Sequence, residues 1–389
     1  MISKLPRLII ATDNFMPKMD GISRFLETIL PELKKHFKII IICPDFKEKN
    51  IEIEGIEFVR IPLTKKYVGD FQLPKIKYNL ISKTLKKDDV LFSQTIGPIG
   101  GLALWLSKKR NLKTIVYTHS LEWLLVSKSI HTFILKKISK IISKLWVKYL
   151  YRKVDYLIVP SERIADMLSW ENINTPKKII NLGVDSNKFI PFSEDKRQKV
   201  RASMAINENE IVIGYHGRIA YEKDLNTLLR AFIKLRKKVN NIKLLIIGSG
   251  VPKLEKKFEN QKDIIHIPMQ MEVENYIPAI DIYCLPSLTE TTSLSTLEAM
   301  SCGLPIVTTG VGFVRDYVRN NYNGYFFPLK DSYTLMKKLE LLCKDKNLRQ
   351  EFGKHSREIA SSGFDWKDTQ KKLIDFIIDL MINLVDKNE

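Results

Sequence analysis

Two glutamates within residues 286–305 have a spacing that could serve chemistry. Glu290 and Glu298 stand eight positions apart in a stretch rich in serine and threonine. An apolar, strand-like run ends just before the stretch, and a helix is predicted from about Ser295 to Gly303, because glycine often ends a helix. A loop followed by a helix start offers free backbone N–H groups, which bind phosphate. The spacing therefore indicates a site for a phosphorylated ligand.

A nucleotide fits this arrangement. The amides near Leu294 and Ser295 would face a phosphate, and Glu298, one turn into the helix, could accept hydrogen bonds from ribose hydroxyls. The alternative is that Glu298 is a first-turn acid that favours the helix dipole. Taken alone, Glu298 is better explained by that structural alternative.

A second stretch, residues 214–224, supplies positive charge. A predicted strand ends at Gly217, and a helix is predicted after Asp224, whose side chain type is a common N-cap. Arg218 and Lys223 lie on the loop between them. Two cations at such a turn can neutralise a pyrophosphate, a task that many phosphate enzymes give to a metal ion. The alternative is an exposed basic loop without a function.

Two residues of the first half are weaker candidates. Gly21 directly precedes a predicted helix, where a glycine lets the backbone approach a phosphate or a sugar closely. His119 ends a predicted strand. A histidine in that position is more often structural than catalytic, so only its expected place at the end of a strand favours a role in a site.

These motifs follow the strands of a predicted α/β fold. Short β-branched runs alternate with helical stretches, and the runs are apolar throughout, as in parallel strands covered by helices on both faces. The pattern restarts once, which predicts two Rossmann-like domains over residues 1–185 and 186–365, followed by a helix over 366–389. Ligands of open parallel sheets bind beyond the carboxyl ends of the strands. We therefore expect the site in a cleft between the two domains.

The chain is strongly basic. Its 389 residues carry a formal net charge of +19, and residues 1–190 hold 33 basic against 18 acidic residues. This asymmetry favours an anionic partner for the first half, either a nucleic acid or an anionic membrane. The alternative is that the lysines are ordinary solvated surface.

Cysteine spacing and hydropathy argue against several classes of protein: metal-binding, disulfide-linked, membrane-spanning and secreted proteins. The four cysteines have neither metal-ligand nor CxxC spacing, so a structural metal centre and disulfides are not expected. Cys43 and Cys284 lie within apolar runs and should be buried. The sequence contains neither an apolar run long enough to span a membrane nor a signal-peptide core, so the expected compartment is the cytoplasm.

Taken together, the motifs resemble those of the retaining glycosyltransferases of family 4 (group 1), which have the GT-B fold. The resemblance covers nearly the whole chain. Its most specific element is the pair Glu290 and Glu298 with the continuation Glu-Ala-Met-Ser-Cys-Gly-Leu-Pro. Further support comes from Gly217-Arg218 with Lys223, from Asn181-Leu-Gly-Val-Asp185 and from Asn323-Gly324.

The resemblance implies a role for each site residue. Arg218 and Lys223 would hold the donor pyrophosphate, with Gly217, Leu294 and Ser295 in the donor pocket. Glu298 would bind ribose, and Glu290 would contact the donor sugar near the reacting carbon. From the first domain, His119 would contact the sugar and Gly21 would line the cleft.

The resemblance also implies the reaction. A hexose would pass from a nucleotide sugar, most often linked to UDP or GDP, with its anomeric configuration retained and without a metal or another cofactor. The first domain would be the acceptor side and the second would bind the nucleotide sugar, while the C-terminal helix would cross back to the first. Charge stabilisation of the leaving diphosphate would supply much of the catalysis.

The chain departs from the family pattern at three places, one of which is Arg315-Asp316 after the loop Gly310-Val-Gly312, where more typical members carry a different charge pattern. Asp20-Gly21 stands where the family usually has two adjacent glycines, and Thr292-Ser293 stands where an aromatic residue and a glycine are usual. Ser293 adds a side chain where backbone normally approaches the sugar. The departure therefore affects the identity of the donor sugar more than the transfer itself.

Residues 127–153 indicate the acceptor. An apolar stripe recurs there at helical spacing beside a stripe of lysines, and residues 123–154 contain no acid. The stripe consists of Ile130, Ile134, Ile138, Ile141, Leu145 and Tyr149. A basic amphipathic helix can lie on an anionic bilayer, where each lysine contributes ~1 kcal/mol. The alternative is that the apolar stripe packs on the sheet, and we expect it to pack while the lysines still attract lipid headgroups. The membrane-facing candidates are Lys137, Lys140, Lys144, Lys148 and Trp146.

The expected acceptor is therefore a membrane lipid or a lipid-linked glycan, with the protein bound peripherally to the inner face of the cell membrane. Two other classes remain open. A nonhydrolysing nucleotide-sugar epimerase shares the architecture but has motifs other than the Glu290–Glu298 pair. A basic nucleic-acid-binding protein would interleave aromatic with basic residues, whereas residues 127–153 are mainly aliphatic.

Overall fold

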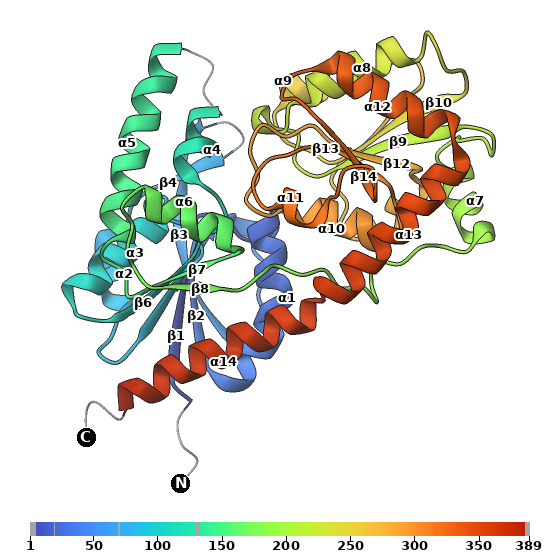
Figure 1. Ribbon diagram of the computed structural model, residues 1–389. Helices are drawn as coiled ribbons and strands as arrows, with labels where there is room; N and C mark the ends of the chain where they lie inside the picture. Colours follow the sequence, from blue (N-terminus) through green and yellow to red (C-terminus); the bar gives the residue numbers. More distant parts are fainter. Residues whose placement is uncertain (1–4, 19, 69–70, 129–132, 386–389) are drawn as a thin grey trace. The chain divides into compact units, whose positions relative to one another are not determined.

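The computed structural model describes residues 5–18, 20–68, 71–128 and 133–385. The chain divides into two compact units (Figure 1). The first unit comprises Met1–Asn181 and Thr369–Glu389, and the second comprises Leu182–Asp368. The division falls four residues before the boundary that we placed at residue 185.

The first unit is built on a sheet that has eight strands within the described residues, in the order β4-β3-β2-β1-β5-β6-β7-β8. Its strands are β1 (Arg7–Ala11), β2 (Lys38–Asp45), β3 (Ile56–Val68), β4 (Phe71–Pro74), β5 (Val90–Ser93), β6 (Lys113–Tyr117), β7 (Tyr156–Val159) and β8 (Lys177–Ile179). Its α-helices are α1 (Gly21–His36), α2 (Tyr78–Thr84), α3 (Pro98–Lys109), α4 (Glu122–Lys128), α5 (Phe133–Tyr151), α6 (Glu162–Trp170) and most of α14 (Trp366–Val385).

The second unit contains a parallel sheet with the strand order β11-β10-β9-β12-β13-β14. Its strands are β9 (Ile211–His216), β10 (Ile242–Ile247), β11 (Ile264–Ile267), β12 (Ile282–Leu285), β13 (Ile306–Thr309) and β14 (Gly324–Phe327). Its α-helices are α7 (Glu194–Ser203), α8 (Leu225–Leu235), α9 (Pro252–Glu255), α10 (Leu294–Ser301), α11 (Val314–Tyr317), α12 (Ser332–Lys344) and α13 (Lys346–Gly363). A 3-10 turn, η2 (Tyr221–Lys223), precedes α8.

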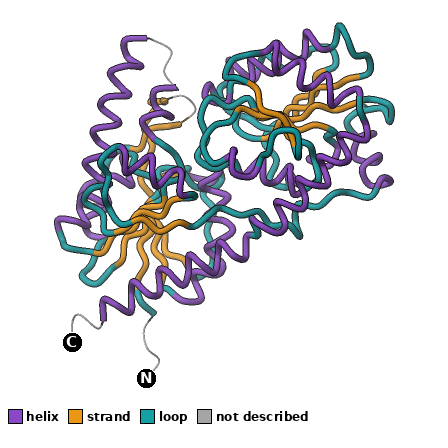
Figure 2. The backbone as a smooth tube through the Cα atoms, in the orientation of Figure 1, coloured by secondary structure: helices purple, strands orange, loops and turns teal. Residues whose placement is uncertain are grey.

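Both units are three-layered, with helices on the two faces of each sheet (Figure 2). This arrangement confirms the predicted α/β class and explains the apolar strands, because a strand covered on both faces has no solvent side. The central strands β1, β5, β12 and β13 are buried almost throughout. All four cysteines are buried as well, as the apolar runs predicted for Cys43 and Cys284.

One feature of the first sheet was not predicted. Strand β3 extends far beyond the apolar run at residues 58–61 that predicts a strand there, and it pairs with β4 in an antiparallel hairpin. Polar residues such as Thr64, Lys65 and Lys66 occupy the extension, which lies at the edge of the sheet. A half-exposed edge strand needs few apolar residues, so a search for apolar runs misses it.

Helix α14 connects to the first unit through specific contacts. The Thr369 hydroxyl donates to the carbonyl of Asn181 at 2.8 Å, and the Gln370 amide donates to the carbonyl of Thr28 at 3.1 Å. Further along, the ring of Phe376 meets the ring of Tyr156 edge to face, with centroids 5.5 Å apart. Within the described part of the chain, no helix is long and apolar enough to cross a bilayer.

Candidate functional site

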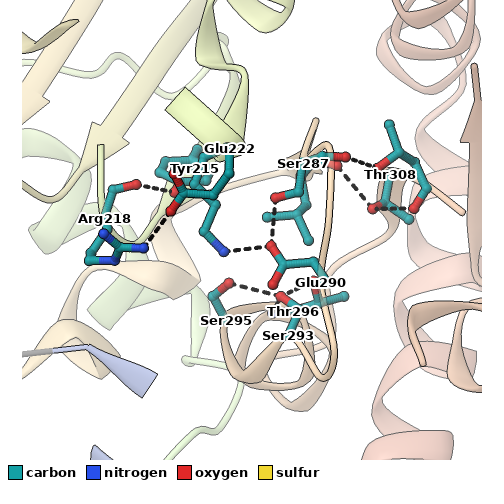
Figure 3. A network of polar contacts seen from close by, with 12 residues as sticks. Tyr215, Arg218, Glu222, Ser287, Glu290, Ser293, Ser295, Thr296 and Thr308 are labelled. Carbon is teal, nitrogen blue, oxygen red and sulfur yellow. Dashed lines mark hydrogen bonds and ion pairs between the residues drawn. The ribbon is translucent and has the colours of Figure 1, made fainter. Parts of the chain in front are cut away.

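The candidate donor site of the second unit lies on loops that follow β9, β12 and β13, which are neighbours in the sheet. Parallel strands end at the same edge, so these loops lie side by side. Figure 3 shows the polar side chains that meet there. They include Arg218 from the first loop, and Ser287 and Glu290 from the second.

The loop after β9 is held close to its neighbour by glycines. Gly217 has φ +135° and Gly248, just after β10, has φ +149°. A Cβ on Gly248 would overlap the carbonyl oxygen of Gly217, so this approach requires glycine. The Tyr215 hydroxyl donates to the carbonyl of Arg218 at 2.7 Å, which fixes the start of the loop.

The two predicted phosphate-binding cations are each paired with a carboxylate. The Arg218 guanidinium contacts Glu222, and the Lys223 ammonium lies 2.5 Å from Oε1 of Glu290. The side chains of Glu222 and Glu290 are only 4% and 8% exposed, so both pairs are largely shielded from solvent. The Ser287 hydroxyl also donates to Glu290, at 2.6 Å. The structure thus brings together Arg218, Lys223 and Glu290 as predicted, and adds Glu222.

The prediction for Asp224 was wrong in detail. Helix α8 does begin directly after it, but Asp224 has a left-handed backbone (φ 46°, ψ 42°) and its side chain caps no helical N–H. Its carboxylate instead accepts a hydrogen bond from the Thr227 hydroxyl at 2.7 Å. The turn that presents Lys223 leaves Asp224 outside the extended conformation that an N-cap residue adopts.

The loop that carries Glu290 is held in place by contacts from the loop after β13. Gly312 has φ +57°, and a Cβ there would overlap the carbonyl oxygen of Glu290. The amide of Phe313 donates to the carbonyl of Thr291 at 2.9 Å. Glycine at position 312 is therefore required by the position of Glu290.

Helix α10 starts one residue before the predicted start, at Leu294. Ser293 is its N-cap: the hydroxyl accepts the amide of Thr296 at 3.3 Å. This role gives a structural reason for the serine that departs from the family pattern. The amides of Leu294 and Ser295 are at the first two helical positions, where no intrahelical acceptor exists. The hydroxyl of the preceding Thr292 is buried and has no hydrogen-bond partner among the described residues.

Glu298 is the fifth residue of α10, so the alternative of a first-turn acid is wrong. Its Oε2 lies 2.6 Å from Nε2 of His216, the last residue of β9. Both side chains are buried. Sequence reasoning missed His216, because only the adjacency of β9 and β12 brings a histidine from one strand to a helix that follows the other.

The first unit places His119 two residues beyond the end of β6, rather than within the strand. Its Nε2 lies 2.9 Å from Oε1 of Gln94, and its ring stacks on that of Tyr117 with centroids 4.4 Å apart. Desolvation by burial lowers the pKa of His119 to about 3. The imidazole is therefore neutral at physiological pH and acts through hydrogen bonds rather than charge.

We expect His119 to show no titration between pH 5 and 8. Because its folded pKa lies below the unfolded value of 6.5, the stability it contributes is complete above 6.5 and is lost as the pH falls toward 3. An NMR titration of the proton on Cε1, the ring carbon between the two nitrogens, checks this prediction. A His119→Gln variant should show a smaller loss of stability over the same acid range, and an inflection near pH 6.5 in the wild-type ring signal would contradict the assignment.

The loop after β1 carries an acid that sequence reasoning missed. Asp13 accepts the amide of Ile99 at 2.7 Å, the amide of Gly100 at 3.2 Å and the Thr95 hydroxyl at 2.5 Å. Desolvation raises the pKa of this carboxyl, although these hydrogen bonds act in the opposite direction. Asp13 thus joins the loop after β1 to the start of α3.

Gly21 is the first residue of α1, and Asp20 caps that helix by accepting the amides of Ile22 and Ser23 at 2.9 Å each. A Cβ on Gly21 would meet no atom within 4 Å. The space around Gly21 therefore does not itself demand glycine. Gly21 and His119 belong to the first unit, whereas the residues predicted to bind the nucleotide and its phosphates belong to the second.

The structure corrects the prediction for α5. The four residues of the apolar stripe whose side chains are described, Ile138, Ile141, Leu145 and Tyr149, are 41–63% exposed, so the expectation that the stripe packs on the sheet was wrong. The helix packs instead through Val147, Leu150 and Tyr151. The side chains of Ile130 and Ile134 lie outside the described residues.

The predicted lysines of α5 differ in environment. Lys144 and Lys148 lie 2.6 and 2.9 Å from the two carboxylate oxygens of Glu171, just after α6, so their charge is partly neutralised. Lys137 and Lys140 are exposed. The Trp146 indole donates to the carbonyl of Ile96 at 3.0 Å and is 43% exposed. Within the described ranges, no three His, Cys, Asp or Glu side chains gather where they could hold a metal ion.

Comparisons with known proteins cover both units. A family model described as glycosyl transferases group 1 matches residues 196–359, and one described as glycosyltransferase family 4 matches residues 19–188. Alpha-monoglucosyldiacylglycerol synthase of Streptococcus pneumoniae is 24% identical over 339 residues, 82% of this chain and 75% of that protein. The synthase of the same name from Acholeplasma laidlawii is 24% identical over 404 residues, 98% of each chain.

Among solved structures, sucrose-phosphate synthase from Thermosynechococcus elongatus superimposes with a TM-score of 0.79 at 16% identity, over 97% of this chain and 100% of the other. The fold and the two matched segments define a GT-B glycosyltransferase. The chain belongs to glycosyltransferase family 4, the group 1 glycosyl transferases.

Proposed function

We propose that the protein transfers a hexose from UDP- or GDP-sugar to a membrane lipid or a lipid-linked glycan, with retention of anomeric configuration and without a metal ion. The observation that carries the proposal is the cluster of Arg218, Lys223 and Glu290 at the carboxyl edge of the second sheet. Family membership favours sugar transfer over the epimerase and nucleic-acid-binding alternatives.

The donor diphosphate would be held by the charges of this cluster. Arg218 and Lys223 are compensated by Glu222 and Glu290 in the structure, so a diphosphate would draw the cations toward its oxygens as negative charge grows on the leaving group. The amides of Leu294 and Ser295 lie at the N-terminus of α10, where the helix dipole is positive. These amides would face the same diphosphate. These residues stabilise the departing diphosphate in the role that a metal ion has in other enzymes.

The remaining residues would position the donor. Glu298, oriented by His216, would accept hydrogen bonds from the ribose hydroxyls, and Glu290 would face the sugar. The buried hydroxyl of Thr292 is available to a hydroxyl of the sugar. The neutral imidazole of His119 would contribute a hydrogen bond to the sugar from the first unit.

A lipid acceptor is supported by two relatives that are named for diacylglycerol glycosylation. It is also supported by α5, which exposes Ile141 and Leu145 beside basic residues. Such a face suits the interface of an anionic membrane. We propose that the protein binds peripherally to the inner face of the cell membrane through α5.

A donor screen tests the proposed function. UDP-, GDP- and ADP-sugars are compared by the rise in melting temperature of the protein, because a ligand at 100 times its Kd stabilises the folded state by about 2.7 kcal/mol. The sugar that stabilises most is then assayed against a membrane lipid extract in the presence of EDTA, and NMR reads the anomeric configuration of the product. Absence of transfer with every donor, or an inverted product, would contradict the proposal.

The membrane contact gives a separate prediction. Replacing both Ile141 and Leu145 by aspartate should weaken binding to phosphatidylglycerol-containing vesicles by about tenfold or more, because two apolar side chains no longer enter the interface. Co-sedimentation measures this binding. Leu329→Asp is the matched control, since Leu329 is an exposed leucine of the second unit (49%). Equal loss in the control, or no loss in the double variant, would reject α5 as the contact.

A further inference from the structure

A cavity of about 760 Å³ lies in the first unit, lined by α3, α5 and the segment before α2. Its walls are formed mainly by aromatic and aliphatic side chains, among them Ile76, Leu102, Trp105, Trp146 and Tyr149. Volumes of this size are typical of small-molecule sites. None of the roles assigned above uses it.

The walls offer few polar atoms to a ligand. The indole N–H of Trp146 is already bonded to the carbonyl of Ile96, and the Ser143 hydroxyl is bonded to the carbonyl of Ser139 at 2.6 Å. A Cβ on Gly101 would lie 3.0 Å from the Trp146 ring, so glycine lets the indole approach α3 closely. Apart from the carboxyl of Glu122, the surface that remains is mainly hydrocarbon, which favours an apolar occupant over a free sugar or a nucleotide.

Part of the cavity lies at the carboxyl edge of the first unit's own sheet. Gly97 and Pro98 follow β5, and Glu122 follows β6 at a distance of three residues from His119. Asp13, beyond β1, accepts the amide of Ile99 in the first turn of α3, which begins directly after Gly97. An occupant of the cavity would therefore leave its polar end at the carboxyl edge of β1, β5 and β6.

Helix α5, the membrane-binding candidate, forms one wall of the cavity. Trp146 and Tyr149 line the cavity from α5, and the neighbouring α5 residues Ile142 and Leu145 are 62% and 63% exposed. Lysine ammonium groups lie over two of the lining rings: Lys109 is 3.6 Å from the centroid of Trp105, and Lys153 is 4.2 Å from that of Tyr149. The rim is thus cationic around an apolar interior, which complements an anionic amphiphile.

One carboxyl side chain, that of Glu122, is among the described residues that line the cavity. The Tyr151 hydroxyl contacts both of its carboxylate oxygens at 3.3 Å. Burial raises the pKa of Glu122 to about 7, so the neutral carboxyl is well populated near physiological pH. A neutral carboxyl can donate a hydrogen bond to an ester or hydroxyl oxygen, and it avoids placing a fixed negative charge beside an apolar chain.

We propose that this cavity binds a hydrocarbon chain of the acceptor lipid, with Glu122 contacting the polar group next to that chain. The inference rests on the proposed function for the identity of the occupant. It deepens that proposal by naming where the chain is held: between α3 and α5, continuous with the exposed face of α5. The chain would leave the membrane along α5 and hold the acceptor headgroup at the edge of the sheet.

Direct binding of a brominated chain tests the cavity without any transfer reaction. The probe is 9,10-dibromostearate at concentrations where it is monomeric, because bromine quenches tryptophan fluorescence at short range and Trp105 and Trp146 line the cavity. We expect saturable quenching with the wild-type protein. Ser143→Phe, which places a ring inside the cavity, should weaken the probe's affinity by about tenfold or more.

The matched control is Ser139→Phe, the same change one turn earlier on α5, at a residue that does not line the cavity. It should bind the probe as the wild type does. If Ser143→Phe fails to fold, Ile76→Gln replaces it, since Ile76 lines the cavity and is 60% exposed, so this change leaves the core intact. Wild-type quenching in either cavity variant would overturn the proposal.

A second measurement separates this inference from the proposed function. Transfer is compared between a long-chain and a short-chain form of whichever lipid acts as acceptor. Ser143→Phe should raise KM for the long-chain form about tenfold and leave both the short-chain reaction and donor binding unchanged. If the probe binds but the protein transfers no sugar, the proposed function fails while the cavity stands. If transfer to the long-chain lipid is unchanged although probe binding is lost, the acceptor is not the occupant.

Discussion

Replacing Lys223 by alanine should lower kcat/KM for sugar transfer by about 10²–10³-fold, the loss that follows removal of one group from a charge-stabilising site. The reason is the position of the ammonium, 2.5 Å from Glu290 on the loop that would receive the donor diphosphate. Glu290→Gln should cause a loss of the same order, because it removes the charge that we propose faces the sugar while it keeps the shape of the side chain. Steady-state rates with the identified donor and acceptor measure both.

Stability must be separated from catalysis in this experiment. Lys223→Ala leaves the buried Glu290 carboxylate without its cation, which destabilises a fold as well as a site. The double variant Lys223→Ala/Glu290→Gln removes that unpaired charge, so it should recover stability while transfer stays lost. Lys237→Ala, at an exposed position after α8, is the control for removal of a lysine. Wild-type turnover in Lys223→Ala or Glu290→Gln would reject this assignment of the site.

The sequence predicted the loops of the site but not all of their partners. Glu290, Glu298, Arg218 and Lys223 follow strands, and the spacing along the chain is enough to place them on one edge of a parallel sheet. The pairing of Glu298 with His216 depends instead on which strands are neighbours in space. Strand order is a property of the whole sheet, so it cannot be predicted from a local sequence pattern.

Helix α5 shows a different limit of sequence reasoning. A period of three to four residues predicts a helix with an apolar face, but it does not say what that face contacts. The structure buries Val147 and Leu150 and exposes Ile141 and Leu145, so α5 has two apolar faces. The sequence also did not predict that Lys144 and Lys148 pair with Glu171, beyond α6. A stretch of sequence without acids can still lie beside an acid from another part of the fold.

The two residues of the Thr292-Ser293 departure differ in whether the structure gives them a role. Ser293 serves as the N-cap of α10, and its hydroxyl bonds back to the helix, so it has a structural role whatever the donor. Thr292 has no such role, because its buried hydroxyl finds no partner among the described residues. A buried hydroxyl without a partner costs free energy unless a ligand supplies one. Thr292 is therefore the better position at which to alter the donor sugar.

Gly312→Ala should remove most of the activity although residue 312 contributes no functional group. Alanine at φ +57° costs about 1–2 kcal/mol, and its Cβ would also overlap the carbonyl oxygen of Glu290. The total loss in the free energy of unfolding should exceed about 3 kcal/mol if the loop holds its place. If the loop moves to relieve the overlap, Glu290 moves with it, and a displacement of about 1 Å at a reacting centre can cost 10²-fold in rate.

Gly303→Ala separates the two causes, because Gly303 has a similar backbone (φ +75°) but its Cβ would only touch Pro191, at 3.4 Å. The control should lose about 1–2 kcal/mol of stability and little activity once folded. Urea unfolding and donor-saturated rates on both variants give the comparison. Equal effects in the two variants would show that backbone conformation alone matters, whereas a larger loss of rate in Gly312→Ala would mean that the loop after β13 sets the position of the Glu290 carboxylate, the group that we propose faces the sugar.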